Sequence, residues 1–271
     1  MSSLISILVS MCFVISSGSV PQPLVQVVQI APNTWAMDVY NLRGAVYQDP
    51  DPTACTAATA QMALNMTALA QTGQAGPVRL SGSKAVRFPG GPDFKWAVST
   101  GRKTTSTLLA YERATTSTKP AVGSDPHGER NALNYYGWGS LDAGVYEDMA
   151  FGTFDAAAKA TVTSIATTGK PVIVFGLNGQ HAQLVTGFTA TGSDPRVSTE
   201  FSVVSVKLTD PLLREYHRDT TLSYATWQHG PLDVRFGADW ETWESDGRDS
   251  VDGLVGAIEW RGNWVIVAAV H

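Results

Sequence analysis

The chain has 271 residues, which is enough for one large domain whose hydrophobic core needs no disulfide to stabilise it. Apolar residues make up 44% of the chain and charged residues 16%, a composition that excludes a disordered or fibrous protein. The formal net charge is −5 and Lys and Arg nowhere form a run, so a nucleic-acid partner is not expected.

The N-terminal segment contains an apolar run, Leu4–Ile15, that is too short to cross a bilayer as a helix. Small residues follow at Ser16–Ser19, as in a cleavage region, although no Lys or Arg precedes the run. Residues 1–20 are therefore interpreted as a signal peptide, which implies an extracellular or cell-envelope location; otherwise a cytoplasmic location is expected. No later segment is apolar and long enough for stable membrane insertion. Because Cys12 lies in this segment, a structural disulfide with Cys55 is not expected.

Helices are predicted mainly in the first half of the remaining chain. Alanine-rich or amphipathic stretches are bounded by capping residues and by Gly or Pro, which are the usual signals for the two ends of a helix. These helices are expected at 53–70, 104–114, 129–136 and 155–168, after two short strand-like runs at 24–30 and 35–40.

Strands are predicted mainly in the second half, where β-branched and aromatic residues alternate with turn signals such as Asn178-Gly179. The expected strands are 172–175, 182–188, 201–208, 232–236 and 264–270. This pattern predicts an α+β fold, with the helices gathered on one side of an antiparallel sheet, in a single domain over residues 21–271.

The stretch Gln48–Leu64 carries a candidate nucleophile. A proline-broken acidic loop leads into Thr53, which can cap the following helix, and Cys55 stands in its first turn. A thiol in this position lies near unpaired backbone amides and the positive end of the helix dipole, which favour a thiolate. The alternative is that Cys55 is a small core residue, as most isolated cysteines are.

His181 and Asp210 are candidate partners for this thiol. His181 follows the Asn178-Gly179 turn and opens one predicted strand, and Asp210 ends the next. Two adjacent antiparallel strands of similar length, joined by a turn at 189–200, would place the start of the first beside the end of the second. A carboxylate beside His181 would fix the imidazole tautomer, and the imidazole could act as the base for a cysteine nucleophile.

Three segments in this order resemble the papain-like cysteine peptidases, and more narrowly the double-glycine-leader (bacteriocin-processing) peptidase domain and its stand-alone relatives. The segments are Gln48 with Cys55-Thr56-Ala57-Ala58, the run from Gly179 to Phe188, and Leu208-Thr209-Asp210-Pro211. The resemblance covers about residues 40–236. It implies a papain-like fold in which an N-terminal helical half carries the nucleophile helix and packs against a C-terminal antiparallel sheet.

The resemblance also implies a role for each matching residue. Cys55 matches the nucleophile, His181 the general base and Asp210 the acid that orients the base. Gln48 matches the side-chain donor of the oxyanion hole, with the Cys55 backbone amide as its partner.

The chain differs from the family pattern at a few positions. Thr56 and Gln180 stand where family members usually have Gly, and Gln48 lies one residue further from Cys55 than is common in papain-like peptidases. These differences leave the catalytic groups in place but would reshape the substrate cleft. No transporter segment adjoins the domain, so leader cleavage coupled to export is not expected.

Two other groups of residues could be read as metal sites. They are His127 with Glu129, and the run Asp246, Asp249 and Asp252. Their spacing fits neither a zinc pair nor a calcium loop, so no metal or cofactor is expected. The tryptophans are expected to pack in and around the core, with a carbohydrate-stacking surface as the alternative.

The sequence thus predicts a thiol-dependent peptidase, acting as a monomer on a peptide or protein substrate through an acyl-enzyme. Two alternatives are open. One is an acyltransferase that uses the same three residues, and the other is a catalytically inactive binding module with a papain-like fold.

Overall fold

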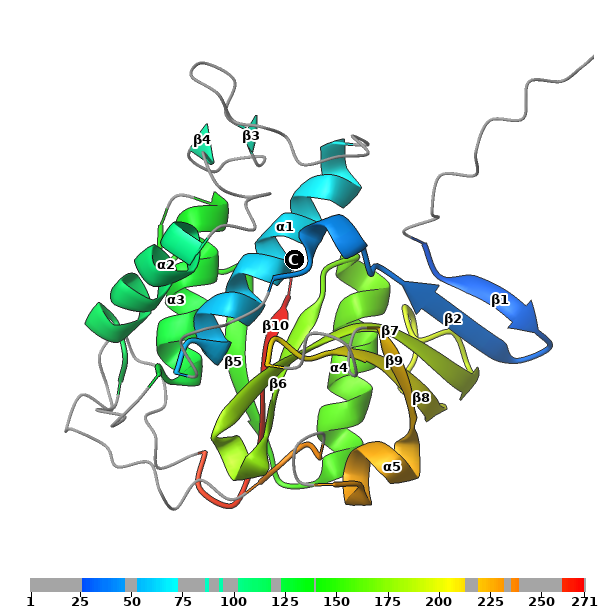
Figure 1. Ribbon diagram of the computed structural model, residues 1–271. Helices are drawn as coiled ribbons and strands as arrows, with labels where there is room; N and C mark the ends of the chain where they lie inside the picture. Colours follow the sequence, from blue (N-terminus) through cyan, green and yellow to red (C-terminus); the bar gives the residue numbers. More distant parts are fainter. Residues whose placement is uncertain are drawn as a thin grey trace, which may run out of the picture.

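The computed structural model describes residues 26–46, 53–72, 86–87, 93–94, 102–117, 123–138, 140–212, 219–231, 235–238 and 260–270. The expected signal peptide at 1–20, Gln48 and the run 246–252 lie outside these residues. The described part is an α+β fold with a large antiparallel sheet (Figure 1). Its helices are α1 (Cys55–Thr72), α2 (Arg102–Ala114), α3 (Pro126–Trp138), α4 (Phe154–Thr168) and α5 (Tyr224–His229), with short 3-10 turns η1 (Leu42–Gly44) and η2 (Leu177–Gly179). Its strands are β1 (Val28–Ala31), β2 (Thr34–Asp38), β3 (Val86–Arg87), β4 (Asp93–Phe94), β5 (Tyr146–Phe151), β6 (Val172–Gly176), β7 (His181–Gly192), β8 (Phe201–Thr209), β9 (Thr220–Ser223) and β10 (Trp264–Ala269).

Strand β7 is the most connected strand of the main sheet. The sheet runs in the order β1-β2-β7-β6-β10-β5, and β8 pairs with both β7 and β9. On one edge of β7, the first half of the strand pairs with β6 and the second half with β2. On its other edge, β7 pairs with β8. Because His181 is the first residue of β7, its backbone is held by the centre of the sheet.

The ladder between β7 and β8 contains two irregularities. Pairing runs from Gly192 opposite Phe201 to Leu184 opposite Thr209, with register shifts on the way. One shift leaves Val204 of β8 as an extra residue, and the other leaves Thr186 of β7 as an extra residue. Such β-bulges bend the strand locally and re-aim the side chains that follow.

The sheet has a hydrophobic core on each face. Along β6, Ile173 and Phe175 belong to the core shared with α1, α2 and α3, whereas Val172 and Val174 belong to the core shared with α4. This alternation follows from the period of two in a strand, and it explains why β6 is apolar at every position. The expectation that all helices gather on one side of the sheet is therefore wrong for α4, which covers the opposite face.

Helix α4 has the local features that the sequence predicts. The Thr153 hydroxyl accepts a hydrogen bond from the Ala156 backbone N–H at 3.2 Å, and Gly169 ends the helix with φ of 67°. Its fully buried Val162 and Ile165 each contribute roughly 1.5–3 kcal/mol by leaving water.

Helix α1 is enclosed on all sides. Every residue from Cys55 to Leu69 is buried. Small alanine side chains let α2, α3 and the sheet approach closely, and several of the polar residues between them have buried partners. The Thr105 hydroxyl donates to Gln61 Oε1 at 2.5 Å, and Asn65 Nδ2 donates to the Gly44 carbonyl at 3.2 Å.

Helix α3 begins three residues earlier than expected. The Asp125 carboxylate accepts a hydrogen bond from the Gly128 backbone N–H at 2.7 Å, and Pro126 occupies the first helical position. Both are standard start signals. Strands β5 and β9 and helix α5 were not predicted, and of the strand expected at 232–236 the structure describes an isolated bridge between Phe236 and Gly176.

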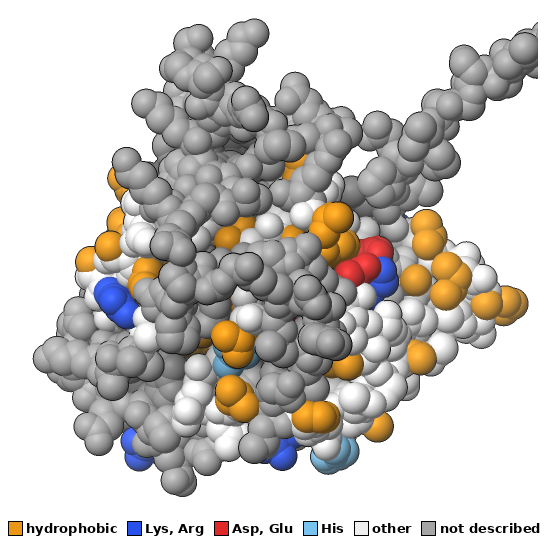
Figure 2. Space-filling model, in the orientation of Figure 1, with side chains coloured by type: hydrophobic (Ala, Val, Ile, Leu, Met, Phe, Trp, Pro, Cys, Tyr) orange, Lys and Arg blue, Asp and Glu red, His pale blue; other side chains and the backbone are white. Residues whose placement is uncertain are grey.

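Charged side chains are sparse on the face shown in Figure 2, where Lys and Arg of the described residues do not gather into a patch. Lys207 is paired with acidic residues, because its ammonium contacts the carboxylates of Asp38 and Asp219. Among the described residues, no helix combines the length and the hydropathy that crossing a membrane requires.

Candidate active site

Cys55 is the first residue of α1, and its side chain lies at the edge of the core. The helix starts with the hydrogen bond from Ala58 N–H to the Ala54 carbonyl at 2.9 Å. Cys55 is a free cysteine and is 7% exposed, so it is covered by neighbours but not sealed from solvent. The first amides of a helix have no acceptor within the helix, which makes this a suitable place for a negative charge.

The structure brings His181 and Asp210 together, as the predicted strand pairing requires. His181 Nε2 lies 2.8 Å from Asp210 Oδ1, and both residues are buried. Asp210 directly follows Thr209, which pairs with Leu184 of β7. The thiol of Cys55 also acts on His181 and raises its pKa, so the two side chains lie close together. The three candidates therefore form one connected group.

Asp210 is held by more than its contact with His181. Gln183 Nε2 donates to Asp210 Oδ2 at 2.7 Å, and the Leu212 backbone N–H donates to Asp210 Oδ1 at 2.7 Å. Burial alone would raise the pKa of Asp210, but the hydrogen bonds from His181 and Gln183 and the His181 charge lower it below its ordinary value. Sequence reasoning missed Gln183, although its position two residues after His181 puts both side chains on one face of β7.

The electrostatic environment of His181 favours its charged form. Burial lowers the pKa of His181, but the interactions with Asp210 and Cys55 outweigh burial and raise the pKa to about 10. The imidazole is thus protonated at neutral pH, between a carboxylate and a thiol. A cation in that place can stabilise a thiolate and can later donate its proton.

The turn before His181 has an unusual backbone. Leu177, Asn178 and Gly179 all have positive φ, of 49°, 54° and 87°. Asn and Gly tolerate this region, whereas Leu does not adopt it readily, so the surroundings must hold the turn in place.

The segment 235–238 supports this turn from outside. Gly237 N–H donates to the Phe175 carbonyl at 2.8 Å, and Arg235 Nη2 donates to Asn178 Oδ1 at 3.4 Å. A Cβ atom on Gly237 would lie 2.5 Å from both Cα and N of Asn178. The segment therefore fits the turn only because residue 237 has no side chain.

We expect Gly237→Ala to destabilise the protein by about 1–3 kcal/mol and to slow reactions of Cys55, because the Asn178 backbone must move and His181 with it. Urea unfolding and the rate of Cys55 alkylation measure the two effects. The matched control is Gly152→Ala, because a Cβ at Gly152 meets nothing within 4 Å among the described residues. Equal behaviour of the two variants would contradict the supporting role of this segment.

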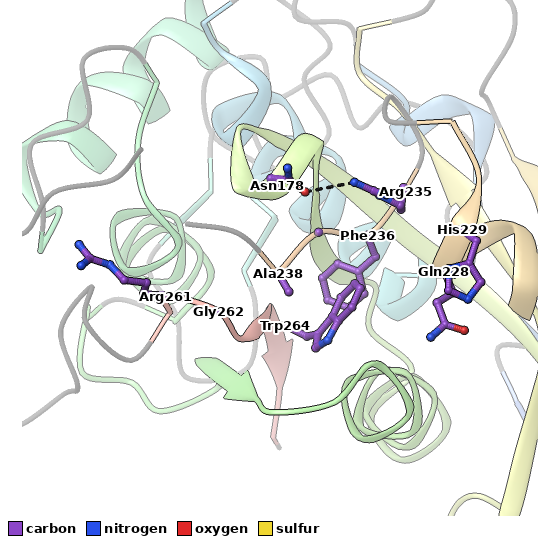
Figure 3. A pocket seen from close by; sticks show the side chains of 10 residues that line it. Asn178, Gln228, His229, Arg235, Phe236, Ala238, Arg261, Gly262 and Trp264 are labelled. Carbon is purple, nitrogen blue, oxygen red and sulfur yellow. Dashed lines mark hydrogen bonds between the residues drawn. The ribbon is translucent and has the colours of Figure 1, made fainter. Parts of the chain in front are cut away.

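A pocket of about 500 Å³ lies beside the turn that precedes His181, and Asn178 of this turn is part of its lining (Figure 3). Phe236 and Trp264 line it with ring centroids 5.2 Å apart, and Asn178 and Arg235 form one wall. Arg261 extends from the turn before β10 and points away from the centre of the pocket in Figure 3. The described lining includes none of Cys55, His181 and Asp210, so the pocket borders the turn before His181 without containing the three candidate residues.

The structure does not bring His127 into this group. Gln48 lies outside the described residues, so its distance from Cys55 is not given by the structure. His127 is buried in α3, where its Nδ1 lies 3.5 Å from Asp148 Oδ1. Within the residues that the structure describes, no three His, Cys, Asp or Glu side chains are arranged to hold a metal ion.

Comparisons with known proteins add no family to this picture. No family model, no curated protein and no solved structure matches the chain.

Proposed function

We propose that this protein is a thiol-dependent peptidase with a papain-like fold. The observation that supports this best is the position of the His181 ring, which hydrogen-bonds to Asp210 and interacts with Cys55 closely enough to have its pKa raised by the thiol. Nucleophile, base and orienting acid come from three separate parts of the chain, in the order expected from the resemblance.

In the proposed mechanism, the Cys55 thiolate attacks the carbonyl carbon of a peptide bond. The His181 imidazolium donates its proton to the leaving amine, and the C–N bond breaks to give a thioester on Cys55. Neutral His181 then takes a proton from water, the resulting hydroxide attacks the thioester, and the acid product leaves while the thiolate is restored. Asp210 keeps the ring oriented throughout and stabilises its charged form.

The tetrahedral intermediate requires donors for its oxyanion. We propose the Cys55 backbone amide and the Gln48 side chain for this role, on the strength of the resemblance and of the helix start at Cys55. Loss of one such donor typically costs on the order of 10²–10³ in kcat.

The interaction between His181 and Cys55 favours a reactive site over a binding module, for which separated side chains would be expected. A peptidase and an acyltransferase share all steps up to the thioester. Product analysis with added amines separates them, because an acyltransferase gives amides of the added amine and a peptidase gives the free acid.

The test of the reactive pair is the pH dependence of alkylation of the full chain by iodoacetamide. Since the pKa of His181 is raised to about 10, we expect Cys55 to be labelled faster in the folded than in the unfolded chain up to about pH 10, where His181 loses its charge. The control is the same chain unfolded in urea, with labelling followed on the peptide that contains Cys55, because the chain also contains Cys12. The proposal is wrong if folded and unfolded chains show the same pH profile.

A further inference from the structure

Two buried glutamates lie behind the first turns of α1, and the proposed mechanism uses neither. Glu112 comes from α2 and Glu129 from α3, and both are 0% exposed. Glu112 Oε2 accepts a hydrogen bond from the Thr56 hydroxyl at 2.7 Å. Glu129 Oε1 lies 2.5 Å from the Thr59 hydroxyl. Both carboxyl groups therefore contact the helix that carries Cys55.

The Thr59 hydroxyl contacts three oxygen atoms but has only one proton to donate. Its hydroxyl oxygen lies 2.8 Å from the Cys55 carbonyl, 2.8 Å from the Thr56 carbonyl and 2.5 Å from Glu129 Oε1. A hydroxyl has one proton and can also accept. All three short contacts are satisfied if Glu129 is a neutral acid that donates to Thr59, while Thr59 donates its own proton toward the two helix carbonyls.

The charges around Glu129 favour the same protonation state. The ionisable groups that face it are Glu112 from α2, Cys55 from α1 and Asp125 from the start of α3. All three are acids, and the second oxygen of Glu129 has no partner among the described residues. Burial raises the pKa of Glu129 well above its ordinary value, and neighbouring Glu112 raises it further.

The arginines that follow the two glutamates in the sequence contact other groups. Arg113 of α2 acts on Glu112 and donates to the Gly123 carbonyl at 2.9 Å. Arg130, the residue after Glu129, contacts Glu147 and Asp148 of β5. Burial raises the pKa of Glu112 to about 8 despite its hydrogen bond with Thr56, so the two glutamates together hold little negative charge at neutral pH.

We infer that Glu129 is a positioning residue for Cys55. As a neutral acid it donates a hydrogen bond to Thr59, which fixes the first turn of α1 through the Cys55 carbonyl, and it places no second negative charge behind the thiolate. The inference rests on the proposed function in one respect, namely that Cys55 is the reacting group.

Two variants of the full chain test this role. Glu129→Gln keeps a donor in place of the acid proton, whereas Glu129→Leu removes it at similar size. We expect the alkylation rate of Cys55 at pH 7 to stay within about twofold for Gln and to fall about fivefold or more for Leu, because Thr59 loses one buried hydrogen bond. We also expect the Tm of the wild type to fall more between pH 6 and pH 9 than that of Glu129→Gln, since Gln cannot ionise.

Glu147→Gln is the matched control, because Glu147 is partly exposed and faces Arg130 rather than α1. It should change neither the alkylation rate nor the pH dependence that is assigned to Glu129. A Gln variant as slow as the Leu variant, or one whose Tm falls as steeply with pH as that of the wild type, would overturn the inference.

If the Glu129→Leu variant does not fold, the comparison of Glu129→Gln with the wild type still decides the inference. If wild-type Cys55 reacts no faster than the unfolded chain, the proposed function fails, and the Tm comparison still tests the state of Glu129.

Discussion

Replacing Cys55 or His181 by alanine is expected to lower kcat for peptide hydrolysis by at least about 10³-fold. The reason is that in the proposed mechanism the nucleophile and the proton donor act as one unit, so loss of either removes the covalent route. The double variant should therefore be no slower than Cys55→Ala by more than a small factor. The measurement is turnover of a fluorogenic peptide mixture by each variant at equal concentration of folded protein, with Tm recorded for each.

His229→Ala is the matched control for the histidine substitution, because His229 is exposed at the end of α5. It should keep wild-type turnover. Hydrolysis that survives in Cys55→Ala would rule out the thiol mechanism, and effects that simply add in the double variant would show that the two residues do not act together.

Asp210→Ala is expected to destabilise the fold by about 3–5 kcal/mol and to abolish turnover. Three donors converge on this buried carboxylate, from His181, Gln183 and the Leu212 backbone, and alanine leaves all three without it. Asp210→Asn should cost less, about 1–2 kcal/mol, because the Gln183 amide can rotate and present its oxygen to the new NH₂ group. Urea unfolding measures both losses.

The pH dependence of the stability lost in Asp210→Asn shows whether the His181–Asp210 pair is responsible. The raised pKa of His181 stabilises the fold fully below its ordinary value of 6.5, and this contribution is lost as pH rises through about 10. The lowered pKa of Asp210 stabilises the fold above its ordinary value of 3.8 and is lost as pH falls below it. The stability difference between wild type and Asp210→Asn should thus be largest between about pH 4 and 6.5. Asp194→Asn, in which a half-buried carboxylate loses its ion pair with the exposed Arg196, should show little change.

The parts of the fold that local sequence signals determine were predicted well. Thr53 and the alanine run locate α1 to within two residues of its observed start, and the valine-rich runs locate β6, β7, β8 and β10. The juxtaposition of His181 and Asp210 followed from strand order and length alone, since an antiparallel hairpin leaves little choice of partner. The side of the sheet that α4 covers was not predictable in this way, because β6 is apolar at every position and therefore fits a helix on either face.

The parts of the site that depend on long-range packing were missed. Gln183 reads as an ordinary polar residue in a strand until β8 brings Asp210 to it. Glu112 and Glu129 lie on helices that also carry exposed residues, and nothing in their local sequence indicates complete burial. Their role as buried contacts of α1 becomes visible only in the folded structure, where α1 is packed between α2, α3 and the sheet.

The two β-bulges in the β7–β8 ladder bear directly on how this site tolerates changes in chain length. The extra Val204 moves β8 out of phase with β7 by one residue, and the extra Thr186 moves β7 by one residue in compensation, so the strands are back in phase at Leu184 and Thr209. Because successive residues of a strand point to opposite faces, a single deletion at either bulge would turn Asp210 away from His181 or shift it by about 3.4 Å. Paired deletion of both extra residues would restore the phase. The site is thus sensitive to the difference between the two strand lengths more than to either length itself.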